Sequence, residues 1–560
     1  MARNFKAWLA ATGAGLISCG SGAAIAETLL DPPPVPLPLA PAVKGPRPKS
    51  DASVLAPAAI KLDPDLQRLA APASLALPNK PEQVRIEALR PLGLKDVENL
   101  AEVNNPNLKA IASQVDQAQS NLRTQIAAWY PTLSINAQNL PTYTGGNQYN
   151  SRPQANQNNE FDTIRGTSYT SRWDMGATLS AQWDLINPQR VPDVAAARDE
   201  FEKAKNQYLI TLRELRLQAA QGYFALQLSD ENVRIGQESV RASIVSLRDA
   251  RARFQAGVAT KLEVLEAETQ LARDQQILTN ALSQQAISRR DLARLLDLPQ
   301  NITPTAKEEL RPLGVWTPSL QESLVAAYAF REELDNVLLD ISAANSRANS
   351  ALGSVQPFLT VFNNLTGLRY DGVENISVDL PGSNGWAVEN AVGLQARWNI
   401  FDGGAARAQY RQAKQRAQEN RFRFAETRDG LRFQVEQSFY SLRQANRNIQ
   451  TTSREVISAR ESLRLARLRF QAGVSTQREV VDNQRDLTQA ELRYASALEQ
   501  YNSNLADLRR RTGLDQVAVC QAPASLPATK PIYDDVQNVP VPPEPLQPAC
   551  QVAMATKSAS

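Results

Sequence analysis

The sequence predicts an α+β membrane protein in which one unit of helices and strands is present twice. Three observations carry this prediction. Residues 253–260 (RFQAGVAT) recur almost unchanged as residues 469–476 (RFQAGVST), and similarity at a fixed distance indicates an internal duplication. Segments of about ten residues alternate apolar and polar side chains, as strands with one face in lipid do. The helical segments between them are too long and too polar for an ordinary globular core.

Charge and composition exclude several classes of function. Lysines and arginines (61) nearly balance aspartates and glutamates (58), so nucleic acid is not an expected partner. Histidine is absent, which removes the commonest general base and the commonest metal ligand. The sequence contains no convergent catalytic constellation, no metal-ligand cluster and no cofactor motif that we can locate. We therefore expect a protein that is not an enzyme and needs no cofactor.

The N-terminus has the pattern of a secretory signal peptide, residues 1–26. Basic residues precede an apolar stretch over residues 7–17, and small residues end at Ala26. Cleavage after Ala26 fits the small-x-small rule and is the preferred interpretation. Residues 16–19 (LISC) also resemble a bacterial lipobox, in which Cys19 would become a lipidated first residue. Either route takes the chain out of the cytoplasm.

Once the signal is processed, Cys520 and Cys550 are the remaining pair of cysteines. In an oxidising compartment we expect them to form a disulfide. Closing a loop of about 30 residues would stabilise the fold by roughly 3 to 4 kcal/mol in the chain-entropy model. A redox or metal pair is the alternative, but the spacing is wide and no further ligands accompany it.

Three segments flank or join the repeats. The lead-in, residues 27–94, is rich in proline and is not expected to form continuous helix or a central strand. The linker spans residues 301–318. The tail, residues 514–560, again contains several prolines.

Each repeat is expected to contain a helix, a strand, a polar loop, a strand, a long helix, a glycine turn and a second long helix. The first repeat spans residues 95–300 and the second residues 319–513. The expected elements of the first are helix 96–129, strand 131–140, loop 141–172, strand 174–186, helix 191–254, a turn at Gly257 and helix 259–296. In the second repeat the strands are expected at 357–364 and 390–401 and the turn at Gly473.

The strands indicate contact with a membrane. Between Met175 and Leu185 every second residue is apolar and the others are polar or small, and the strands around Leu133 and Val392 alternate in the same way. Such strands fit a tilted crossing of the hydrocarbon layer, with Trp183 and Trp398 in the aromatic belt at the lipid interface. Half-buried strands of a soluble sheet would alternate equally, but the secretion signal and the polar helices favour the membrane.

Four strands cannot close a transmembrane barrel, and lipid does not tolerate open sheet edges. The chain is therefore expected to oligomerise, and three protomers would supply twelve strands. The last helix carries a narrow a/d stripe that includes Leu487, Leu498 and Leu505, with polar residues around it. A helix of this kind packs along coiled-coil seams while its broad faces remain wet, as the wall of a water-filled tube requires.

This pattern resembles the TolC-type outer membrane efflux protein family over about residues 95–513. The order of the motifs carries the resemblance more than any one of them. They are Asn104-Asn105-Pro106-Asn107-Leu108, Tyr130-Pro131-Thr132-Leu133, Trp183-Asp184-Leu185, Trp398-Asn399-Ile400-Phe401-Asp402-Gly403-Gly404 and the two RFQAGV turns.

The resemblance implies a homotrimer with a twelve-stranded outer membrane β-barrel continued by a twelve-helix periplasmic α-barrel. It also implies two protein partners, a periplasmic adaptor and an inner membrane transporter, as well as contact with outer membrane lipid. In that family the hairpin turns lie at the periplasmic tip and meet the adaptor. This places Ala256, Gly257 and Val258 at one tip and Ala472, Gly473 and Val474 at the other, although both segments could simply be turns.

Acidic residues follow both turns. Glu479 and Asp482 match positions where the family places acidic rings that narrow the closed entrance and attract cations, and Glu263 and Glu266 occupy the equivalent places in the first repeat. Rings of like charge would make closure depend on pH and salt. The alternative is that these acids belong to an ordinary solvated helix face.

The resemblance predicts a passive export duct of a tripartite efflux or type I secretion system. A periplasmic coiled-coil adaptor is the alternative, but an adaptor is expected to have one hairpin flanked by a lipoyl-like β-domain. This chain has two hairpins, each preceded by two amphipathic strands, which favours the duct. The sequence does not identify the exported substrate.

Overall fold

The computed structural model describes residues 64–67, 69–72, 75, 77–86, 88–155, 161–376, 383–515, 517–518 and 549–551. All of them belong to one compact unit, residues 51–560. The predicted signal peptide, Cys19 and Cys520 lie outside the described residues. Among the described helices, none combines the length and the apolar character that a membrane-spanning helix needs.

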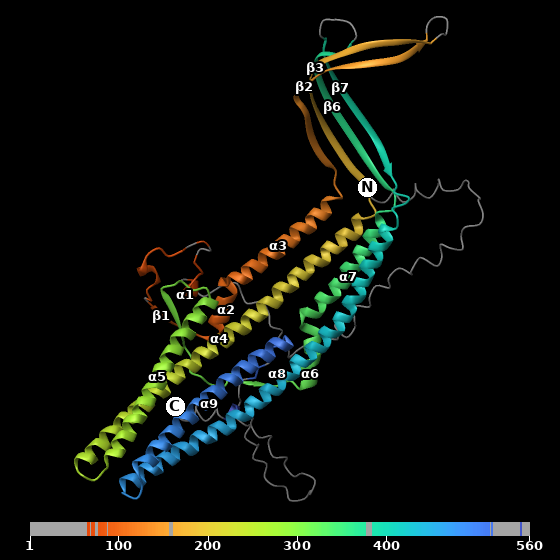
Figure 1. Cartoon of the computed structure of the whole chain (residues 1–560). Coiled ribbons are helices and arrows are strands. Elements are labelled where there is room, and N and C mark those ends of the chain that lie inside the picture. Colours follow the sequence, from red (N-terminus) through yellow and green to blue (C-terminus); the bar gives the residue numbers. More distant parts are fainter. Residues whose placement is uncertain are drawn as a thin grey trace, which may run out of the picture. The chain divides into compact units, whose positions relative to one another are not determined.

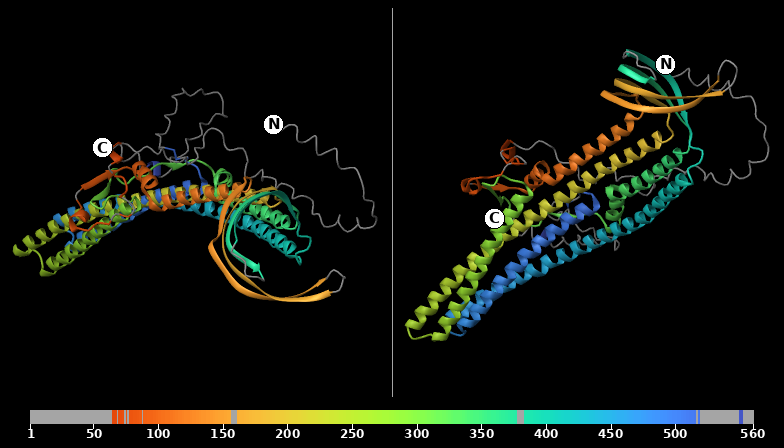
Figure 2. Two further views of the ribbon diagram at one scale, coloured as in Figure 1. Left: turned by 90° about the horizontal axis from the view of Figure 1, so that it is seen from above. Right: turned by 45° about the horizontal axis from the view of Figure 1, so that its top comes forward.

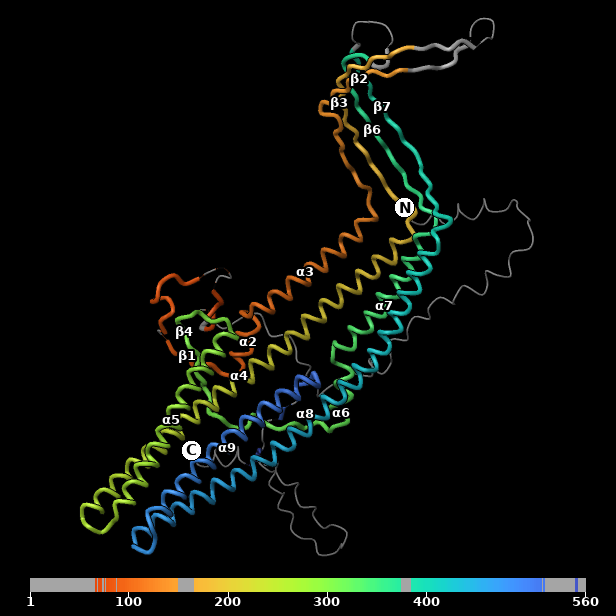
Figure 3. Tube along the Cα trace, viewed as in Figure 1, coloured from red at the N-terminus to blue at the C-terminus, as the bar shows by residue number. Residues whose placement is uncertain are grey.

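The two repeats have the same order of elements, as Figures 1 and 3 show. The first comprises α2 (Leu94–Asn104), α3 (Pro106–Ala127), β2 (Thr132–Ala155), β3 (Phe161–Ile186), α4 (Arg190–Gln255) and α5 (Lys261–Leu295). The second comprises α6 (Leu320–Phe330), α7 (Glu332–Gly353), β6 (Phe358–Ile376), β7 (Ser383–Arg397), α8 (Ala405–Gln471) and α9 (Gln477–Thr512).

The first helix of each repeat is interrupted, whereas the sequence predicted one continuous helix over 96–129. Asn105 leaves the helical conformation (φ −56°, ψ 122°), and its side chain caps the next helix by accepting a hydrogen bond from the amide of Leu108. Pro106 explains the break, because proline disfavours the helical conformation in the residue before it. In the second repeat Arg331 interrupts the helix at the equivalent position, with φ −94° and ψ 119°.

The strands are longer than predicted, although β7 ends at Arg397 and not at residue 401. The expected polar loop over 141–172 is wrong. β2 and β3 pair in antiparallel register from Thr132↔Gln182 to Ala155↔Phe161, with one irregularity between Gln138 and Thr142. Asn139 adopts a positive φ of 54° at this irregularity. The outer part of the hairpin is polar on both faces, so it lacks the period-two signal by which a half-buried strand is recognised.

The four long strands form one antiparallel sheet in the order β2-β3-β6-β7, so β2 and β7 are its edges. Many apolar side chains of this sheet are exposed in the isolated chain. Examples are Leu133, Ile135, Trp386, Val388, Val392 and Leu394. A soluble sheet would bury such side chains against a second layer, which the described residues do not provide here.

The helices form two hairpins that pack side by side. α5 returns along α4 and α9 returns along α8, as the right view in Figure 2 shows. α4 also contacts α7 and α9, so the helices of the two repeats meet mainly through α4, while their strands meet where β3 pairs with β6. The a/d stripe predicted for the last helix is buried at Leu498, Tyr501, Leu505 and Leu508.

The lead-in and the linker pack onto this helical layer. Leu69 is buried in the cluster formed by α2, α4 and α5, and Asn104 holds it by donating a hydrogen bond to its carbonyl oxygen (2.8 Å). β1 (Ala88–Leu92) pairs in parallel with β4 (Ile302–Ala306) of the linker, and β5 (Val315–Trp316) pairs with β8 (Val517–Ala518). β1 tolerates Pro91 because its sheet has two strands, so both are edge strands. The shorter described elements of the lead-in are α1 (Pro64–Gln67) and η1 (Pro81–Val84).

The end of the tail docks on the second repeat. The amide of Ala549 donates to the Asn446 side chain of α8 (3.0 Å), and Ala549 and Cys550 are both buried. Cys550 is disulfide-bonded. Its predicted partner, Cys520, lies outside the described residues, so this pairing stays a prediction.

Candidate functional site

Both hairpin turns have the same backbone geometry. Gly257 has φ 75° and Gly473 has φ 74°, the left-handed conformation that favours glycine. In the first turn the amide of Gly257 donates to the carbonyl of Phe254, and the amide of Val258 donates to that of Arg253, each at 3.0 Å. The equivalent bonds close the second turn. A side chain at either glycine would meet open space. Glycine is therefore required by the backbone conformation and not by crowding.

The turns present small apolar side chains to solvent. Val258 and Val474 are each 67% exposed, and Ala256 and Ala472 beside them are also exposed. Each tip therefore ends in a short Ala-Gly-Val surface that no described part of the chain covers. A partner protein could bury this surface, but its role as an adaptor contact remains a prediction.

The acids after the first turn have local partners. Glu263 closes a capping box with Thr260, whose amide donates to the glutamate (3.2 Å) while the Thr260 hydroxyl accepts from the Glu263 amide. Glu266 forms an ion pair with Arg478 of the other hairpin at 3.5 Å. One acid therefore stabilises the start of α5, and the other ties the two tips together.

The acids after the second turn are also paired. Glu479 accepts from Arg469 (2.7 Å) and from the Ser475 hydroxyl (2.5 Å), and the Thr476 side chain makes no capping bond. Asp482 lies 3.2 Å from Arg485. The sequence predicted rings of like charge, and the arginines that pair with these acids were not predicted. The i, i+3 spacing of Asp482 and Arg485 could have revealed one of them.

A cation–π contact also joins the two tips. The guanidinium of Arg253 lies over the ring of Phe470, 4.3 Å from its centre. The equivalent arginine of the second repeat, Arg469, turns instead to Glu479 of its own hairpin. The two turns thus share a backbone but differ in their side-chain contacts.

A polar seam joins α4 to α9 above the turns. The hydroxyls of Ser239 and Thr488 lie 3.1 Å apart, and Gln477 donates to Ser246 (2.5 Å). A cavity of about 640 Å³ opens along this seam and is lined by residues of both hairpins. Hydrogen bonds between neutral side chains can be exchanged for bonds to water at little net cost, so this seam can separate more readily than an apolar one.

The first hairpin contains a buried carboxylate. Asp274 is 0% exposed and accepts hydrogen bonds from Ser243 and Gln270, the latter at 3.0 Å. In the register that aligns Gly257 with Gly473, the second repeat has Ala459 and Ala490 in place of Ser243 and Asp274, which makes its hairpin apolar there. This difference between the repeats was not among the predicted features of the sequence.

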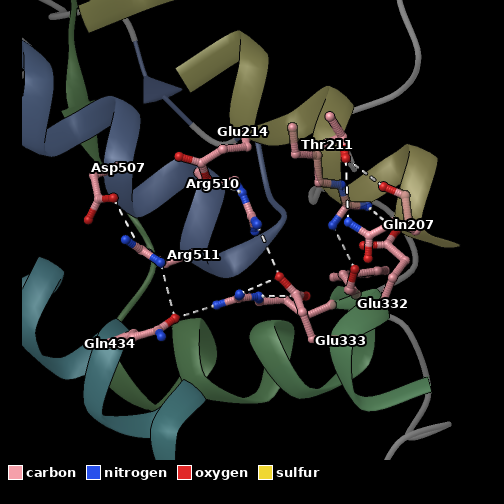
Figure 4. A network of polar contacts seen from close by, with 12 residues as sticks. Gln207, Thr211, Glu214, Glu332, Glu333, Gln434, Asp507, Arg510 and Arg511 are labelled. Atoms are coloured by element: carbon pink, nitrogen blue, oxygen red, sulfur yellow. Dashed lines mark hydrogen bonds and ion pairs between the residues drawn. The ribbon is translucent and has the colours of Figure 1, made fainter. Parts of the chain in front are cut away.

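A network of charged residues joins α4, α7, α8 and α9 at the break between α6 and α7 (Figure 4). Glu333 lies 2.5 Å from Arg331 and 3.0 Å from Arg510, and the two arginine side chains are only 4% and 6% exposed. Arg213 pairs with Glu332 at 2.8 Å and donates to the carbonyl of Phe330. Burial acts to raise the pKa of Glu333, but the bond and charge of Arg331 and the charge of Arg510 outweigh it and lower the pKa to about 2.

The two predicted interface tryptophans occupy equivalent positions. The indole N–H of Trp183 donates to the carbonyl of Trp129, and that of Trp398 donates to the carbonyl of Val355, each at 3.1 Å. Each bond ties the end of a strand to the segment where the preceding helix leads into the sheet. The rings remain exposed, as an aromatic residue at a lipid interface requires.

Comparison with known proteins gives one consistent result. The model of the family described as outer membrane efflux protein matches residues 97–297 and 326–514. The chain is 20% identical over 450 residues to the outer membrane protein TolC of Vibrio cholerae, covering 78% of this chain and 94% of that protein. It is 23% identical over 433 residues to the alkaline protease secretion protein AprF of Pseudomonas aeruginosa, covering 76% and 85%. The solved structure of CusC has the same fold, with a TM-score of 0.60 at 19% identity, covering 82% of this chain and 99% of CusC.

Proposed function

This chain belongs to the outer membrane efflux protein family, and on this premise we propose that it is the export duct of a tripartite efflux or type I secretion system. It is an outer membrane protein with its helices in the periplasm. The adaptor alternative is wrong, because the family model spans both repeats. The duct performs no chemistry of its own, and its partners supply the energy.

The observation that carries this proposal is the four-stranded sheet with two free edges, β2 and β7. Unpaired backbone groups at such edges are too costly in hydrocarbon, so β7 of one copy pairs with β2 of the next. Three copies close a twelve-stranded barrel, and their hairpins continue it as a twelve-helix tunnel. The apolar side chains exposed on the sheet then face lipid, with Trp183 and Trp398 at its periplasmic border.

The hairpin tips are the proposed contact with a periplasmic adaptor, which connects the duct to an inner membrane transporter. Val258 and Val474 supply apolar surface there, and the glycine turns fix its shape. The acids after the turns form the proposed gate. Their pairing with Arg469, Arg478 and Arg485 supports a closed tip held by neutralising contacts within each protomer.

Imaging of the protein purified from outer membranes tests the proposal. We expect a trimeric tube with a membrane barrel, whereas a monomer or a species without a barrel would refute it. The gate is tested separately by the double substitution Glu479→Gln and Asp482→Asn, which removes two charges per protomer and breaks the ion pairs with Arg469 and Arg485. We expect higher single-channel conductance in planar bilayers, and unchanged conductance would remove the role assigned to these acids.

A further inference from the structure

Helix α8 is far more basic than the equivalent helix of the first repeat. It carries fourteen arginines and one lysine against six acidic residues, a net charge of +9. α4 carries eleven basic and nine acidic residues, a net charge of +2. Since the two helices occupy the same place in the repeated unit, the fold itself does not require this charge.

Eight of the arginines lie along one face of α8, and we call this set of residues the arginine stripe. Successive members are separated by about one, two or three whole turns, so each returns to the same face of the helix. The members are Arg407, Arg411, Arg421, Arg428, Arg432, Arg443, Arg447 and Arg454. All eight are exposed, and the stripe extends for roughly 70 Å at 1.5 Å per residue.

Most of the stripe has no acidic partner among the residues that the structure describes. Arg428 pairs with its neighbour Asp429, and Arg432 pairs with Glu436 one turn away. Five members form no ion pair and no side-chain hydrogen bond with any residue that the structure describes. They are Arg407, Arg411, Arg443, Arg447 and Arg454.

The equivalent face of α4 in the first repeat indicates which side of the helical layer the arginine stripe occupies. In the register that aligns the two glycine turns, Arg428, Arg432 and Arg443 correspond to Leu212, Arg216 and Gln227. On α4 these positions lie beneath the attached segments. Leu212 packs with the cluster around α2, Arg216 pairs with Glu102 of α2, and Gln227 donates to the linker carbonyl of Glu308. Figure 2 shows α2 and β1 on one face of the helical layer.

A different set of residues on α4 faces the second repeat. It comprises Lys203, Arg213, Ser239 and Ser246, which contact Asp340, Glu332, Thr488 and Gln477. If the proposed duct is open inside, attached segments must lie on its outer surface. The inference rests on that function. The equivalent positions of α8 are Glu419, Asp429, Glu455 and Ser462, and they would face the neighbouring protomer. The arginine stripe lies on the other face, the one equivalent to the outer face of α4.

We propose that the arginine stripe binds a carboxylate-bearing polymer of the periplasm, namely the peptide stems of the cell wall. Guanidinium groups bind carboxylates through two parallel hydrogen bonds, which a row of arginines can repeat along an extended polyanion. Lipid headgroups occupy a layer of only about 5 to 7 Å beyond the hydrocarbon on each side. They can therefore reach Arg407 and Arg411 after the end of β7, but not the rest of the stripe. In the trimer three such stripes would anchor the duct where it passes through the wall.

A sedimentation assay with isolated cell-wall sacculi tests this proposal. The full-length protein, confirmed as a trimer by imaging, is incubated with sacculi over a range of salt concentrations, and the bound fraction is measured. The stripe variant replaces the five unpaired arginines with glutamine. The matched control replaces five exposed arginines elsewhere, so both variants lose the same charge. The control positions are Arg85, Arg123, Arg198, Arg248 and Arg273.

We expect the wild-type protein to bind sacculi, with binding that weakens as salt rises. The stripe variant should bind sacculi at least roughly fivefold more weakly, because it loses five exposed ion pairs that each contribute modestly to binding. The control variant should keep most of its binding. Equal losses in both variants, or no binding by the wild type, would overturn the proposal. So would a stripe variant that loses binding to phosphatidylglycerol vesicles but not to sacculi, which would identify lipid as the ligand. A protein that does not form a trimeric tube would fail the imaging step and refute the proposed function separately.

Discussion

Replacement of Glu333 by glutamine tests whether the charged network at the α6–α7 break stabilises the protein. The pKa of Glu333 is about 2 in the folded chain, compared with an ordinary value of 4.5. This difference corresponds to about 3 kcal/mol of stability per protomer at neutral pH, at 1.36 kcal/mol for each pH unit. The variant would also leave Arg331 and Arg510 without their shared carboxylate, and breaking a buried pair typically costs about 3 to 5 kcal/mol.

The sign of the pH dependence follows from the lowered pKa. Glu333 contributes its full stability above the unfolded pKa, and this contribution is lost as the pH falls from about 4.5 towards 2. For a chain of this size, 3 kcal/mol corresponds to a shift in melting temperature of about 3 °C. We expect thermal unfolding followed by circular dichroism to show this shift at pH 7, and less than half of it at pH 3.

Glu426→Gln is the matched control, because Glu426 is an exposed acid of α8 for which the described residues show no ion pair. It should leave the melting temperature unchanged at both pH values. A Glu333→Gln variant as stable as the wild type at pH 7 would refute the argument. So would a destabilisation that is equally large at pH 3, because the charge of Glu333 could not then be its cause.

Two further pairs of variants test the buried carboxylate of the first hairpin and the glycine turn of the second. Ser243→Ala alone should destabilise the first hairpin by about 1 to 2 kcal/mol, because the buried Asp274 loses a hydrogen-bond donor. The double variant Ser243→Ala with Asp274→Ala should be close to neutral or stabilising, because it reproduces the alanine pair of the second hairpin. Both can be compared in melting temperature, and a double variant less stable than the single one would contradict this account. Gly473→Ala should lower the free energy of unfolding by about 1 to 2 kcal/mol, because alanine is strained at the positive φ of this turn. Gly430→Ala should raise it by about 0.5 to 1 kcal/mol, because Gly430 lies in the middle of α8 and a side chain there meets open space. The same measurement checks them, and equal effects of the two alanines would refute the backbone argument.

The extent of the strands shows one limit of the sequence patterns. Alternation identified the segments around Leu133 and Met175, where one face is apolar. It missed the outer part of the β2–β3 hairpin, which continues to Ala155 and Phe161. Because both faces of that part are polar, nothing in the pattern distinguishes it from a loop, and only the backbone pairing between the two strands defines it.

The duplicated order of strands, helices and glycine turns was determined by the sequence itself, because each of these features depends on neighbouring residues. A left-handed turn needs glycine at one position, and an a/d stripe needs only its own helix. Tertiary structure alone decided which charges far apart in the sequence neutralise one another. Glu266 meets Arg478 and Glu333 meets Arg510 although the members of each pair are far apart in the sequence, and the buried Asp274 of α5 accepts a hydrogen bond from Ser243 of α4. Such contacts depend on how the two repeats and their hairpins lie side by side, which no local pattern records.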